Sequence, residues 1–521
     1  MKIVVAEKIA PAAMQLLQAI PGAEVLTPEE FAAAPEAAVA GADALIVRSA
    51  VQADAALIDA GQSLRVIGRA GVGVDNIDVE TATRRGIVVM NAPGASAVSV
   101  AELTLGLMLT MARHIAKADQ STRAGKWEKK SLQGTELAGK TLGIIGLGRI
   151  GTEVARRAQA FGMKVIGSDP YLSPARAKEL NIELVTLEQV YAQADYLSLH
   201  LALTHQTAGM IDAGALAQMK KGVRLVNCAR GELVDEAALE AALRSGHVAA
   251  AALDVFHEEP ARNTGLLSAP NLVATPHLGA STKEGQEAVG IQIARQVRDY
   301  LLQGVAQNAV NLPSLTDTEY KQIEPYIGLA GKLGRFAAQL FASNLAEIEV
   351  RFEGQVGAWK TQLIRASAVA AVLQSDRNEP TNLINALAAA EERGVVVREQ
   401  RAEAETKANV IRLKLTGPTG AVSCSGTLVN GRPRLTQLNS IDIESQLEGN
   451  FIVVANLDAP GVVGGIGTLL GRHGINIARL SLGREDGQAL AIVQVDEAVS
   501  AEVMAGLRGV ASVQRVYSVI V

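Results

Sequence analysis

Cysteine and histidine, the residues that most often build disulfide frameworks and metal sites, are scarce in this chain of 521 residues. There are two cysteines, Cys228 and Cys424, and seven histidines. Two cysteines so far apart in the sequence make neither a disulfide framework nor a metal-ligand spacing. We therefore expect no bound metal, and a reducing cytoplasm is the compartment that fits best.

Long apolar runs and an excess of positive charge are also lacking. The most apolar stretches, such as residues 103–111, are too short or too interrupted by glycine and charge to span a bilayer. The amino terminus, MKIVVAEKIA, is typical of a first strand rather than of a signal peptide. With a net charge of −5, no global basic field attracts nucleic acid, so an anionic substrate must be bound by a local arginine cluster.

The chain length predicts three or four domains of roughly 100 to 200 residues each. Over residues 1–92, short apolar runs alternate with helical stretches, which indicates βαβ units and a parallel sheet. A long helical segment is expected over residues 99–118. Seven further strand candidates then alternate with helices, as a doubly wound dinucleotide-binding domain requires.

The rest of the chain indicates two smaller α+β regions. Residues 314–450 combine amphipathic helices with strands, and Asn430-Gly431 suits a type I′ hairpin turn. Residues 451–521 follow a βαββαβ order, which is ferredoxin-like. Such a four-stranded sheet is expected to leave one face and its edges free for pairing, which favours a regulatory or assembly role.

Residues 141–170, TLGIIGLGRIGTEVARRAQAFGMKVIGSDP, have the glycine spacing of a dinucleotide-binding loop between a strand and a helix. Gly146 permits the tight turn, Gly148 lets the backbone approach a pyrophosphate, and Gly151 lets the helix pack on the strand. The helix N-terminus and Arg149 supply positive charge. Asp169 ends the next strand and would bind the ribose hydroxyls, which favours NAD over NADP. The alternative is a glycine turn with a surface aspartate.

Two histidines follow strand runs, where ligands of doubly wound folds bind, and the pattern alone does not choose between them. His277 precedes a turn that would expose it, whereas His200 is expected to pack at a strand end. Glu259 is placed to hold an imidazole, and Arg230 to bind a carboxylate bidentately. For a lone arginine or glutamate, a solvated surface charge is the competing interpretation.

Four motifs, GLGRIG, NCARGELVDE, ALDVFHEEP and TPHLGAST, occur in the order seen in the D-2-hydroxyacid dehydrogenase family. The chain resembles that family over essentially its whole length, and within it the long type that acts on 3-phospho-D-glycerate. The resemblance implies a substrate-binding domain (1–95 and 285–312), a Rossmann NAD-binding domain (96–284), an intervening domain (314–450) and an ACT domain (451–521). Closure is expected about the crossings near residues 93–100 and 280–290.

The resemblance also implies the roles of site residues. His277 is the acid/base, Glu259 its partner, and Arg230 binds the substrate's carboxylate and reacting oxygen. Other substrate contacts are implied for the backbone of Val72 and Gly73 and for Arg48 and Ser49. Arg48 is the expected phosphate contact, with a strand-end salt bridge as its alternative. The implied cofactor positions are Val72, Gly146, Gly148, Arg149, Ile150, Gly151, Asp169, Leu201, Cys228, Ala229, Arg230, Asp254, His277, Leu278, Gly279 and Ala280.

The chain departs from the family pattern at several places. Val72 and Leu201 are apolar where the family often has threonine, and Ser96 stands where asparagine is usual. In the ACT-like region, Asp458 and Asn476 are the implied contacts of an L-serine effector. Asn456 replaces the histidine or tyrosine of some relatives, and a purely structural domain is the alternative.

The activity implied by the resemblance is NAD-dependent oxidation of 3-phospho-D-glycerate to 3-phosphohydroxypyruvate, which opens the phosphorylated route to serine, in a homo-oligomer that is a tetramer or dimer. One alternative is a dehydrogenase for another 2-hydroxy acid, such as glycerate or a hydroxypyruvate. Another is a non-enzymatic NAD-sensing module similar to the C-terminal-binding corepressors. The ACT-like tail and the absence of a long disordered flank favour the enzyme.

Overall fold

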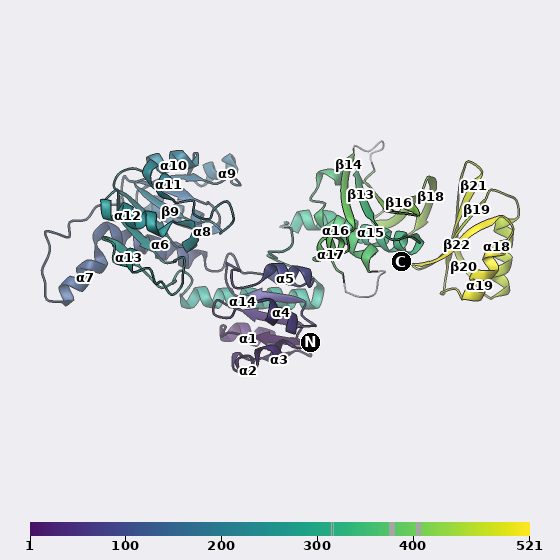
Figure 1. Ribbon diagram of the computed structural model, residues 1–521, viewed down its shortest axis with the longest axis horizontal. Helices are drawn as coiled ribbons and strands as arrows, with labels where there is room; N and C mark the ends of the chain where they lie inside the picture. Colours follow the sequence, from purple (N-terminus) through teal and green to yellow (C-terminus); the bar gives the residue numbers. More distant parts are fainter. Residues whose placement is uncertain (314, 316, 375–380, 403–407) are drawn as a thin grey trace. The chain divides into compact units, whose positions relative to one another are not determined.

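The computed structural model describes residues 1–313, 315, 317–374, 381–402 and 408–521. Within these residues the strands form sheets of five, seven, six and four strands. Figure 1 shows the ribbon with its helices and strands labelled. Strands of the first two sheets pair in parallel, the third sheet is mixed and the fourth is antiparallel. This confirms the expected fold class. Residue 314, the expected start of the intervening domain, lies outside the described residues.

The first sheet has the order β2-β1-β3-β4-β5. Helix α14, from much later in the chain, packs on this region: a Cβ on Gly290 would lie 3.4 Å from Cβ of Ala13, and one on Gly68 would lie 2.9 Å from Ile293. The elements are β1 (Lys2–Val5), α1 (Pro11–Gln18), β2 (Glu24–Leu26), α2 (Pro28–Ala33), α3 (Pro35–Val39), β3 (Ala44–Val47), α4 (Ala55–Ala60), β4 (Val66–Arg69), α5 (Val79–Arg84), β5 (Val88–Met90) and α14 (Lys283–Gln303).

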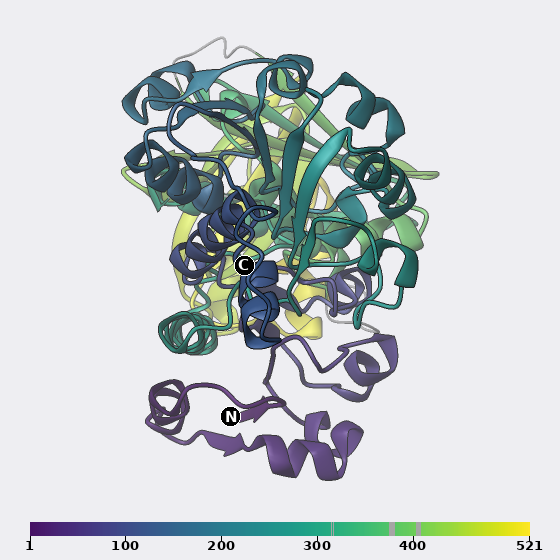
Figure 2. The same cartoon turned by 90° about the vertical axis from the view of Figure 1, so that its left-hand side faces the viewer.

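The second sheet has the order β12-β11-β10-β9-β6-β7-β8, and helices lie on both of its flanks (Figure 2). β6 and β9 are parallel neighbours at which the order of the strands reverses, since β7 and β8 lie on one side of β6 and β9 to β12 on the other. In such folds ligands bind in the crevice at the carboxyl ends of these strands. Its elements are α6 (Ala97–Arg113), α7 (Ile115–Arg123), β6 (Thr141–Ile145), α8 (Arg149–Ala160), β7 (Lys164–Ser168), α9 (Pro174–Glu179), β8 (Glu183–Leu184), α10 (Leu187–Gln193), β9 (Tyr196–Leu199), α11 (Ala213–Gln218), β10 (Val223–Asn227), the 3₁₀ helix η1 (Gly231–Leu233), α12 (Glu236–Ser245), β11 (Val248–Leu253), α13 (Thr264–Leu267) and β12 (Leu272–Ala274).

The helical segment expected over residues 99–118 is broken. Helix α6 ends at Arg113, His114 adopts a left-handed conformation with φ 53°, and α7 begins at Ile115. The two helices diverge by 63°. In the described part of the chain no single helix has both the length and the apolarity of a membrane span, although α6 and α7 meet that criterion if joined across their bend.

The third sheet has the order β14-β13-β15-β16-β17-β18, and its hairpin between β16 and β17 turns at Asn430 and Gly431. Their φ angles of 52° and 74° are both positive, as a type I′ turn requires, so this prediction is confirmed. The elements are α15 (Asp317–Leu340), β13 (Glu347–Glu353), η2 (Gln355–Ala358), α16 (Gln362–Leu373), α17 (Ala386–Glu392), β14 (Val396–Ala402), β15 (Val410–Gly417), β16 (Gly420–Val429), β17 (Arg432–Leu438) and β18 (Ile441–Gln446).

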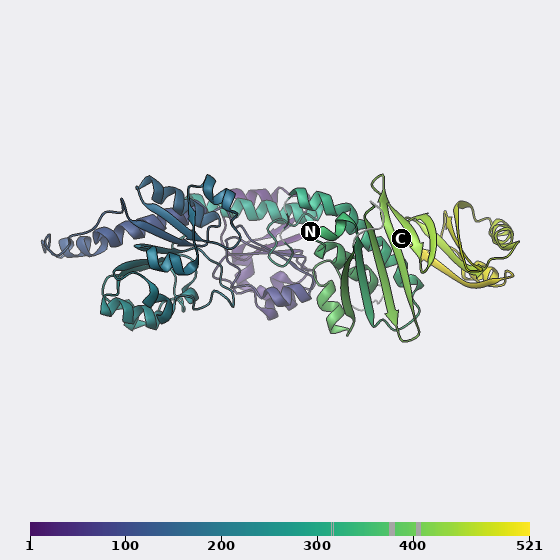
Figure 3. The same ribbon diagram turned by 90° about the horizontal axis from the view of Figure 1, so that it is seen from above.

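The fourth sheet has the order β20-β21-β19-β22 and confirms the predicted βαββαβ arrangement. Ile452 and Val454 pack with Ile466 and Leu507, so both helices cover the same face of the sheet (Figure 3). The elements are β19 (Asn450–Leu457), α18 (Val462–Arg472), β20 (Ile477–Glu485), β21 (Gln488–Val495), α19 (Ala501–Arg508) and β22 (Val513–Ile520).

The opposite face of this sheet is covered, contrary to the expectation that it would be free. Phe451, Val453 and Leu490 share one hydrophobic core with residues of α15, and the rings of Phe451 and Phe336 meet edge to face at 6.3 Å. The reason is that successive side chains of β19 point to opposite faces of the sheet. Ile452 and Val454 face the two helices, whereas Phe451 and Val453, which are equally apolar, point to the other face and must also be buried.

Packing divides the chain into two compact units. One comprises Met1–Ile77 and Met90–Asn308, and the other Asp78–Val89 and Ala309–Val521. The second unit thus includes α5, although this helix lies between two strands of the first sheet in the sequence. The four-domain division at residues 95, 285, 314 and 451 remains a prediction.

Candidate active site

The glycine-rich loop of residues 146–151 lies at the end of β6 and leads into α8. Gly146 has φ 92°, and a Cβ there would lie 2.4 Å from the carbonyl oxygen of His200. A Cβ on Gly151 would lie 2.1 Å from the carbonyl oxygen of Gly146, whereas one on Gly148 would meet no atom within 4 Å. The outer two glycines are therefore needed for packing, and Gly148 leaves open the space before the α8 N-terminus that a pyrophosphate would take.

Asp169 follows β7 and is held beside this loop. Its Oδ2 accepts a hydrogen bond from the backbone N–H of Leu147 at 2.7 Å, and its Oδ1 accepts from Tyr171 and Leu172 at 2.7 and 3.1 Å. A carboxylate has about four lone-pair sites, and these three bonds leave one of them, on Oδ2, without a partner. Asp169 can therefore accept one further hydrogen bond, from a ribose hydroxyl, and its charge repels a 2′-phosphate.

Several other residues expected at the cofactor lie near the glycine-rich loop or in the core beneath it. Arg149 is the first residue of α8, and its Nη1 would lie 2.7 Å from a Cβ on Gly94. Leu201 packs against Gly146, its Cδ2 3.0 Å from a Cβ built there. Ile150 packs on the core that contains the buried Cys228, and burial raises the pKa of the Cys228 thiol to about 12. Ala229 is buried beside it.

His277 and Glu259 form a hydrogen-bonded pair. Nδ1 of His277 lies 2.7 Å from Oε2 of Glu259, and Oε1 of the same carboxylate accepts from the backbone N–H of Phe256 at 3.2 Å. An ionised carboxylate only accepts hydrogen bonds, so Nδ1 carries the proton and Nε2 of the neutral ring is a proton acceptor. The His277 side chain is 49% exposed, so this nitrogen is accessible to a substrate.

Asp254 fixes the backbone around His277. Its buried carboxylate accepts hydrogen bonds from the backbone N–H groups of Leu278 and Gly279 at 2.7 and 2.8 Å and from the Thr275 hydroxyl at 2.6 Å. His277 itself has φ 53°, an unusual conformation for a residue with a side chain. Asp254 therefore holds a strained turn, while Leu278 and Ala280 remain exposed.

Arg230 lies against the loop that contains Val72 and Gly73. Its Nε donates to Oδ2 of Asp75 at 2.9 Å and its Nη1 to the carbonyl of Ala229 at 2.6 Å. A Cβ on Gly73 would lie only 1.5 Å from Arg230 Nη2. The glycine at 73 thus makes room for the guanidinium group, and one face of Arg230 remains for an anion.

Sequence reasoning missed Arg69, the last residue of β4. Its guanidinium folds over the next loop, because a Cβ on Gly71 would lie 1.3 Å from Arg69 Nη1. Its buried Nε has no hydrogen-bond partner among the described residues. Burial, and then the charge of Arg230, lower the pKa of Arg69 to about 10, so the group is still cationic at neutral pH. Arg69 lies in the stretch GRAGVGVDN, residues 68–76, of which only Val72 and Gly73 were expected in the site.

Arg48 and Glu7 complete the charged cluster that surrounds Arg69. Nη1 of Arg48 donates a hydrogen bond to the carbonyl of Lys8 at 3.0 Å. Arg48 forms no ion pair among the described residues, so the strand-end salt bridge, which was the alternative to a phosphate contact, is not seen there. Oε1 and Oε2 of Glu7 instead accept from the backbone N–H groups of residues 48, 50 and 51. Ser49 is exposed beside Arg48.

Asn227 is a second residue that sequence reasoning missed. It is fully buried at the end of β10, where its Oδ1 accepts from Ala229 N–H at 3.0 Å and its Nδ2 donates to the Arg230 carbonyl at 2.7 Å. These bonds hold the turn that presents Arg230. The only signal in the sequence is its place at a strand end, three residues before an arginine.

His200 follows β9 and is half-buried, whereas His277 is exposed. Its Nε2 forms a hydrogen bond with Ser198 Oγ at 2.8 Å, and burial lowers its pKa to about 4. It is therefore neutral at physiological pH, and its buried Nδ1 has no hydrogen-bond partner among the described residues. Ser96, the other departure from the family pattern, is buried at the N-terminus of α6, and its hydroxyl has no hydrogen-bond partner among the described residues.

The two expected effector residues are not brought together within one chain. Asp458 follows β19 and lies 3.6 Å from Arg484, whereas Asn476 precedes β20 and donates to Asp496 at 2.8 Å. The antiparallel register of β19 and β21, from Asn450↔Val495 to Leu457↔Gln488, puts them at opposite ends of the sheet, roughly 25 Å apart at about 3.3 Å per residue. Within one chain these two residues are therefore too far apart to contact one small effector, and their role in binding L-serine remains a prediction.

No group of three or more histidine, cysteine, aspartate or glutamate side chains in the described ranges is arranged to hold a metal ion.

Comparison with known families adds two matches. Residues 105–279 match the NAD-binding domain of the D-isomer specific 2-hydroxyacid dehydrogenases. Residues 322–439 match the intervening domain of D-3-phosphoglycerate dehydrogenase.

Individual relatives extend this similarity to the rest of the chain. D-3-phosphoglycerate dehydrogenase of Methanocaldococcus jannaschii is 39% identical over 99% of both chains. Among solved structures, a glyoxylate reductase from Paecilomyes thermophila is 33% identical, covers 60% of this chain and 98% of its own, and has a TM-score of 0.55. D-lactate dehydrogenase from Aquifex aeolicus, complexed with NAD and lactic acid, is 27% identical with coverages of 60% and 100% and a TM-score of 0.54.

Proposed function

The chain belongs to the D-3-phosphoglycerate dehydrogenase family and is an NAD-dependent oxidoreductase, and on that basis we propose that it oxidises 3-phospho-D-glycerate at C2 to 3-phosphohydroxypyruvate. One observation carries the proposal: a His277–Glu259 pair with a free imidazole nitrogen, in the same compact unit as a cluster of arginines. The pair suits oxidation of an alcohol, and the cluster suits an anionic substrate.

The charge of the arginine cluster suits an anionic substrate. Arg48, Arg69 and Arg230 face the carboxylates of Glu7 and Asp75, so the cluster has one formal positive charge in excess. Arg69 is enclosed and its Nε lacks a partner, a state that costs free energy unless an anion completes its hydrogen bonds. We assign Arg48 and Arg69 to the phosphate, and Arg230 with the backbone N–H groups of Val72 and Gly73 to the carboxylate.

The proton is moved by His277. Nε2 accepts the C2 hydroxyl proton, and the imidazolium that forms is stabilised by Glu259, to which Nδ1 already donates at 2.7 Å. Arg230 polarises the C2 oxygen as it becomes a carbonyl. NAD, when bound, supplies the acceptor of the C2 hydride.

The residues around the glycine-rich loop suit NAD. Gly148 leaves space at the α8 N-terminus, and Asp169 is positioned for the ribose hydroxyls of NAD and against the phosphate of NADP. The remaining cofactor assignments, from Val72 and Ile150 to Ala280, follow from the family pattern.

The decisive experiment compares substrates. We expect phosphohydroxypyruvate to oxidise NADH with a kcat/KM at least about 100-fold above that for unphosphorylated hydroxypyruvate, because each charged hydrogen bond to the phosphate contributes about 1.5–3 kcal/mol. Equal rates with both would favour the alternative substrate class, and no turnover of either would favour an NAD-sensing module.

For the C-terminal region we propose an ACT domain that binds L-serine as an allosteric effector in a cytoplasmic homotetramer, with neither nucleic acid nor membrane as a partner. The ferredoxin-like order supports this, and the separation of Asp458 from Asn476 requires two copies if one serine is to contact both. Isothermal titration should detect serine binding in the oligomer, and Asp458→Ala and Asn476→Ala should each abolish it. Binding that survives both substitutions would reject these contacts.

A further inference from the structure

Helix α5 is held by residues that are far away in the sequence. The segment Asp78–Val89, which contains α5 and most of β5, belongs to the same compact unit as Ala309–Val521. Three asparagines of that unit, Asn311, Asn382 and Asn385, form hydrogen bonds with it. Asparagine is suited to this task because its amide both donates and accepts.

Two of these residues bind the C-terminal end of α5, where backbone carbonyls lack partners within the helix. Nδ2 of Asn382 donates to the carbonyl of Gly86 at 2.8 Å, and Nδ2 of Asn385 donates to that of Arg84 at 3.1 Å. The contact is close, since a Cβ on Gly86 would lie 2.5 Å from Asn382 Nδ2.

The local turn fixes the orientation of both amides. Oδ1 of Asn382 accepts from Ile384 N–H at 2.9 Å, and Oδ1 of Asn385 accepts from Asn382 N–H at 2.7 Å. With their oxygens engaged in this way, both amide nitrogens point toward α5. Asn311 holds the other side of the segment, where its Oδ1 accepts from Val89 N–H at 2.9 Å and its Nδ2 donates to the Ile87 carbonyl at 2.8 Å.

The same segment is joined at both ends to the loop of residues 71–77, to which we assign the substrate carboxylate. Asp78 caps α5 and follows Ile77 directly in the chain. At the other end, Asn91 follows β5 and donates from Nδ2 to the carbonyl of Val72. A displacement of α5 is therefore transmitted to Val72 and Gly73 through peptide bonds and one hydrogen bond.

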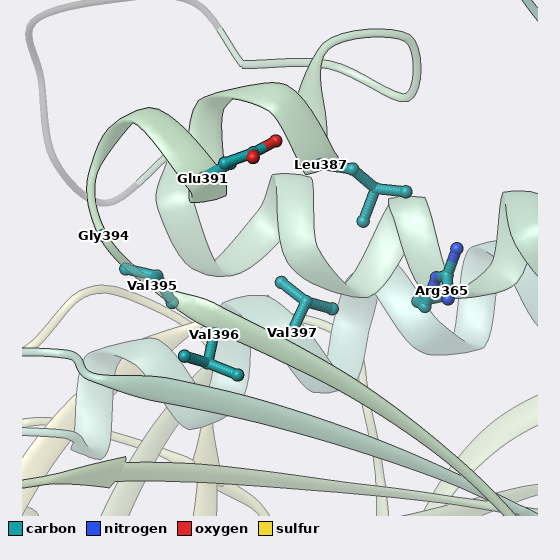
Figure 4. A pocket seen from close by; sticks show the side chains of 7 residues that line it. All are labelled: Arg365, Leu387, Glu391, Gly394, Val395, Val396 and Val397. Carbon is teal, nitrogen blue, oxygen red and sulfur yellow. The ribbon is translucent and has the colours of Figure 1, made fainter.

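Helix α17, which begins directly after Asn385, has room to move. A pocket of about 480 Å³ lies beside it. Figure 4 shows Leu387 of α17 and Val397 of β14 at this pocket, with Glu391 on the same helix. A helix with open space on one side can shift at a lower packing cost than one enclosed on all sides.

We propose that Asn382 is a positioning residue for catalysis: with Asn385 it holds α5, and through α5 the loop of residues 71–77, in the conformation that binds the substrate carboxylate. Movements of α17 then reach the substrate loop by this route. The kinetic consequence rests on the proposed function, whereas the structural consequence does not.

The test is Asn382→Asp, which keeps the Oδ1 acceptor of the turn and replaces the donor to Gly86 by an oxygen. We expect KM for phosphohydroxypyruvate to rise about threefold to tenfold, as the loss of one hydrogen bond predicts. kcat should be unchanged, because His277 is not affected. KM for NADH should rise less than KM for phosphohydroxypyruvate, because Val72 is the one expected cofactor contact within the loop of residues 71–77 and the glycine-rich loop is not affected. A residue that merely stabilises the domain would lower the melting temperature without this split.

The matched control is Asn409→Asp in the same domain. Asn409 also accepts from a backbone N–H, that of Val356 at 3.0 Å, and donates from Nδ2, to the Tyr326 hydroxyl at 3.1 Å. This variant should leave KM for phosphohydroxypyruvate unchanged. An unchanged KM in Asn382→Asp, or an equal rise in both variants, would overturn the proposal.

A second measurement does not depend on turnover. In hydrogen exchange, the amides of residues 71–77 should exchange faster in Asn382→Asp than in Asn409→Asp, and equal exchange rates would also overturn the proposal. If Asn382→Asp fails to fold, Asn382→Ser, which keeps a shorter acceptor oxygen, is tested against the same two outcomes.

Discussion

At the residue scale, the proposed chemistry depends on one imidazole whose orientation is set by its neighbours. His277 has φ 53°, so asparagine, which tolerates the left-handed region, is a better test residue than alanine. We expect His277→Asn to lower kcat by about 10²–10⁴-fold, the usual contribution of a general base. NADH affinity should be retained, because Asp254 still holds the neighbouring N–H groups. Steady-state kinetics and a fluorescence titration measure both, and undiminished turnover would reject the assignment.

The second prediction at this scale concerns His200 and acid stability. Burial lowers its pKa to about 4, below the ordinary value of about 6.5. Between these pH values the unfolded chain binds more protons at His200 than the folded chain does. The free energy of unfolding therefore has its full value above about pH 6.5, decreases as the pH falls, and loses nothing further from His200 below about pH 4. The loss is at most roughly 3 kcal/mol at about 1.36 kcal/mol per pKa unit.

Thermal unfolding of wild type and His200→Gln between these pH values measures the effect. The variant has no titrating ring at this position, so its stability should depend less steeply on pH. Parallel curves for the two proteins would show that another group causes the acid sensitivity.

At the scale of elements, the glycines of the β6–α8 loop make separable contributions. A Cβ on Gly148 meets no atom within 4 Å, so Gly148→Val should fold normally but place its side chain where the pyrophosphate binds. We expect NADH affinity to fall by at least about tenfold with an unchanged melting temperature. Gly151→Ala is the contrasting control: its Cβ would lie 2.1 Å from the Gly146 carbonyl oxygen, so it should lower the melting temperature. Equal melting temperatures for the two variants would contradict this division.

Features that depend on residues close together in the sequence could be predicted from the sequence alone. Gly146, Gly148, Gly151 and Asp169 fall within one short stretch, and the order of strands and helices could be predicted from apolar alternation and turn residues. The pairing of His277 with Glu259 was also suggested by the residues themselves, since each follows a strand of the same sheet and the carboxyl ends of parallel strands share one edge.

Features that depend on three-dimensional register could not be predicted. Asp458 and Asn476 are both near strand ends, but only the antiparallel pairing of β19 with β21 reveals that these are opposite ends. Likewise, the sequence around Phe451 and Val453 does not indicate that α15 covers these side chains. Arg69 was missed because an arginine at a strand end is usually solvated, and only the structure shows its guanidinium folded over Gly71.

At the scale of the whole molecule, the second compact unit, here called the C-terminal unit, contains a hydrophobic core that is shared by the third and fourth sheets. Phe451 is 1% exposed in that core and meets Phe336 edge to face. We expect Phe451→Ala to destabilise the C-terminal unit by about 3–5 kcal/mol, as for other buried phenylalanines. Scanning calorimetry should show a lower transition temperature. NADH binding should persist at about room temperature, because the glycine-rich loop belongs to the first compact unit.

The control for this prediction is Phe161→Ala. Phe161 is 43% exposed, so removal of its ring should change the free energy of unfolding by no more than about 0.5 kcal/mol. A similar loss of stability in both variants would contradict the idea of a shared core around Phe451.

The burial of both thiols has a practical consequence for site-specific labelling. Burial raises the pKa of Cys228 and of Cys424 to about 12, so almost no thiolate, the form that attacks alkylating reagents, is present at neutral pH. A cysteine introduced on the surface would react with a maleimide dye far faster than either native one. Donor and acceptor fluorophores can therefore be attached to introduced cysteines without first replacing the two native ones. A change in energy transfer during turnover would then show that the distance between the two labelled sites changes.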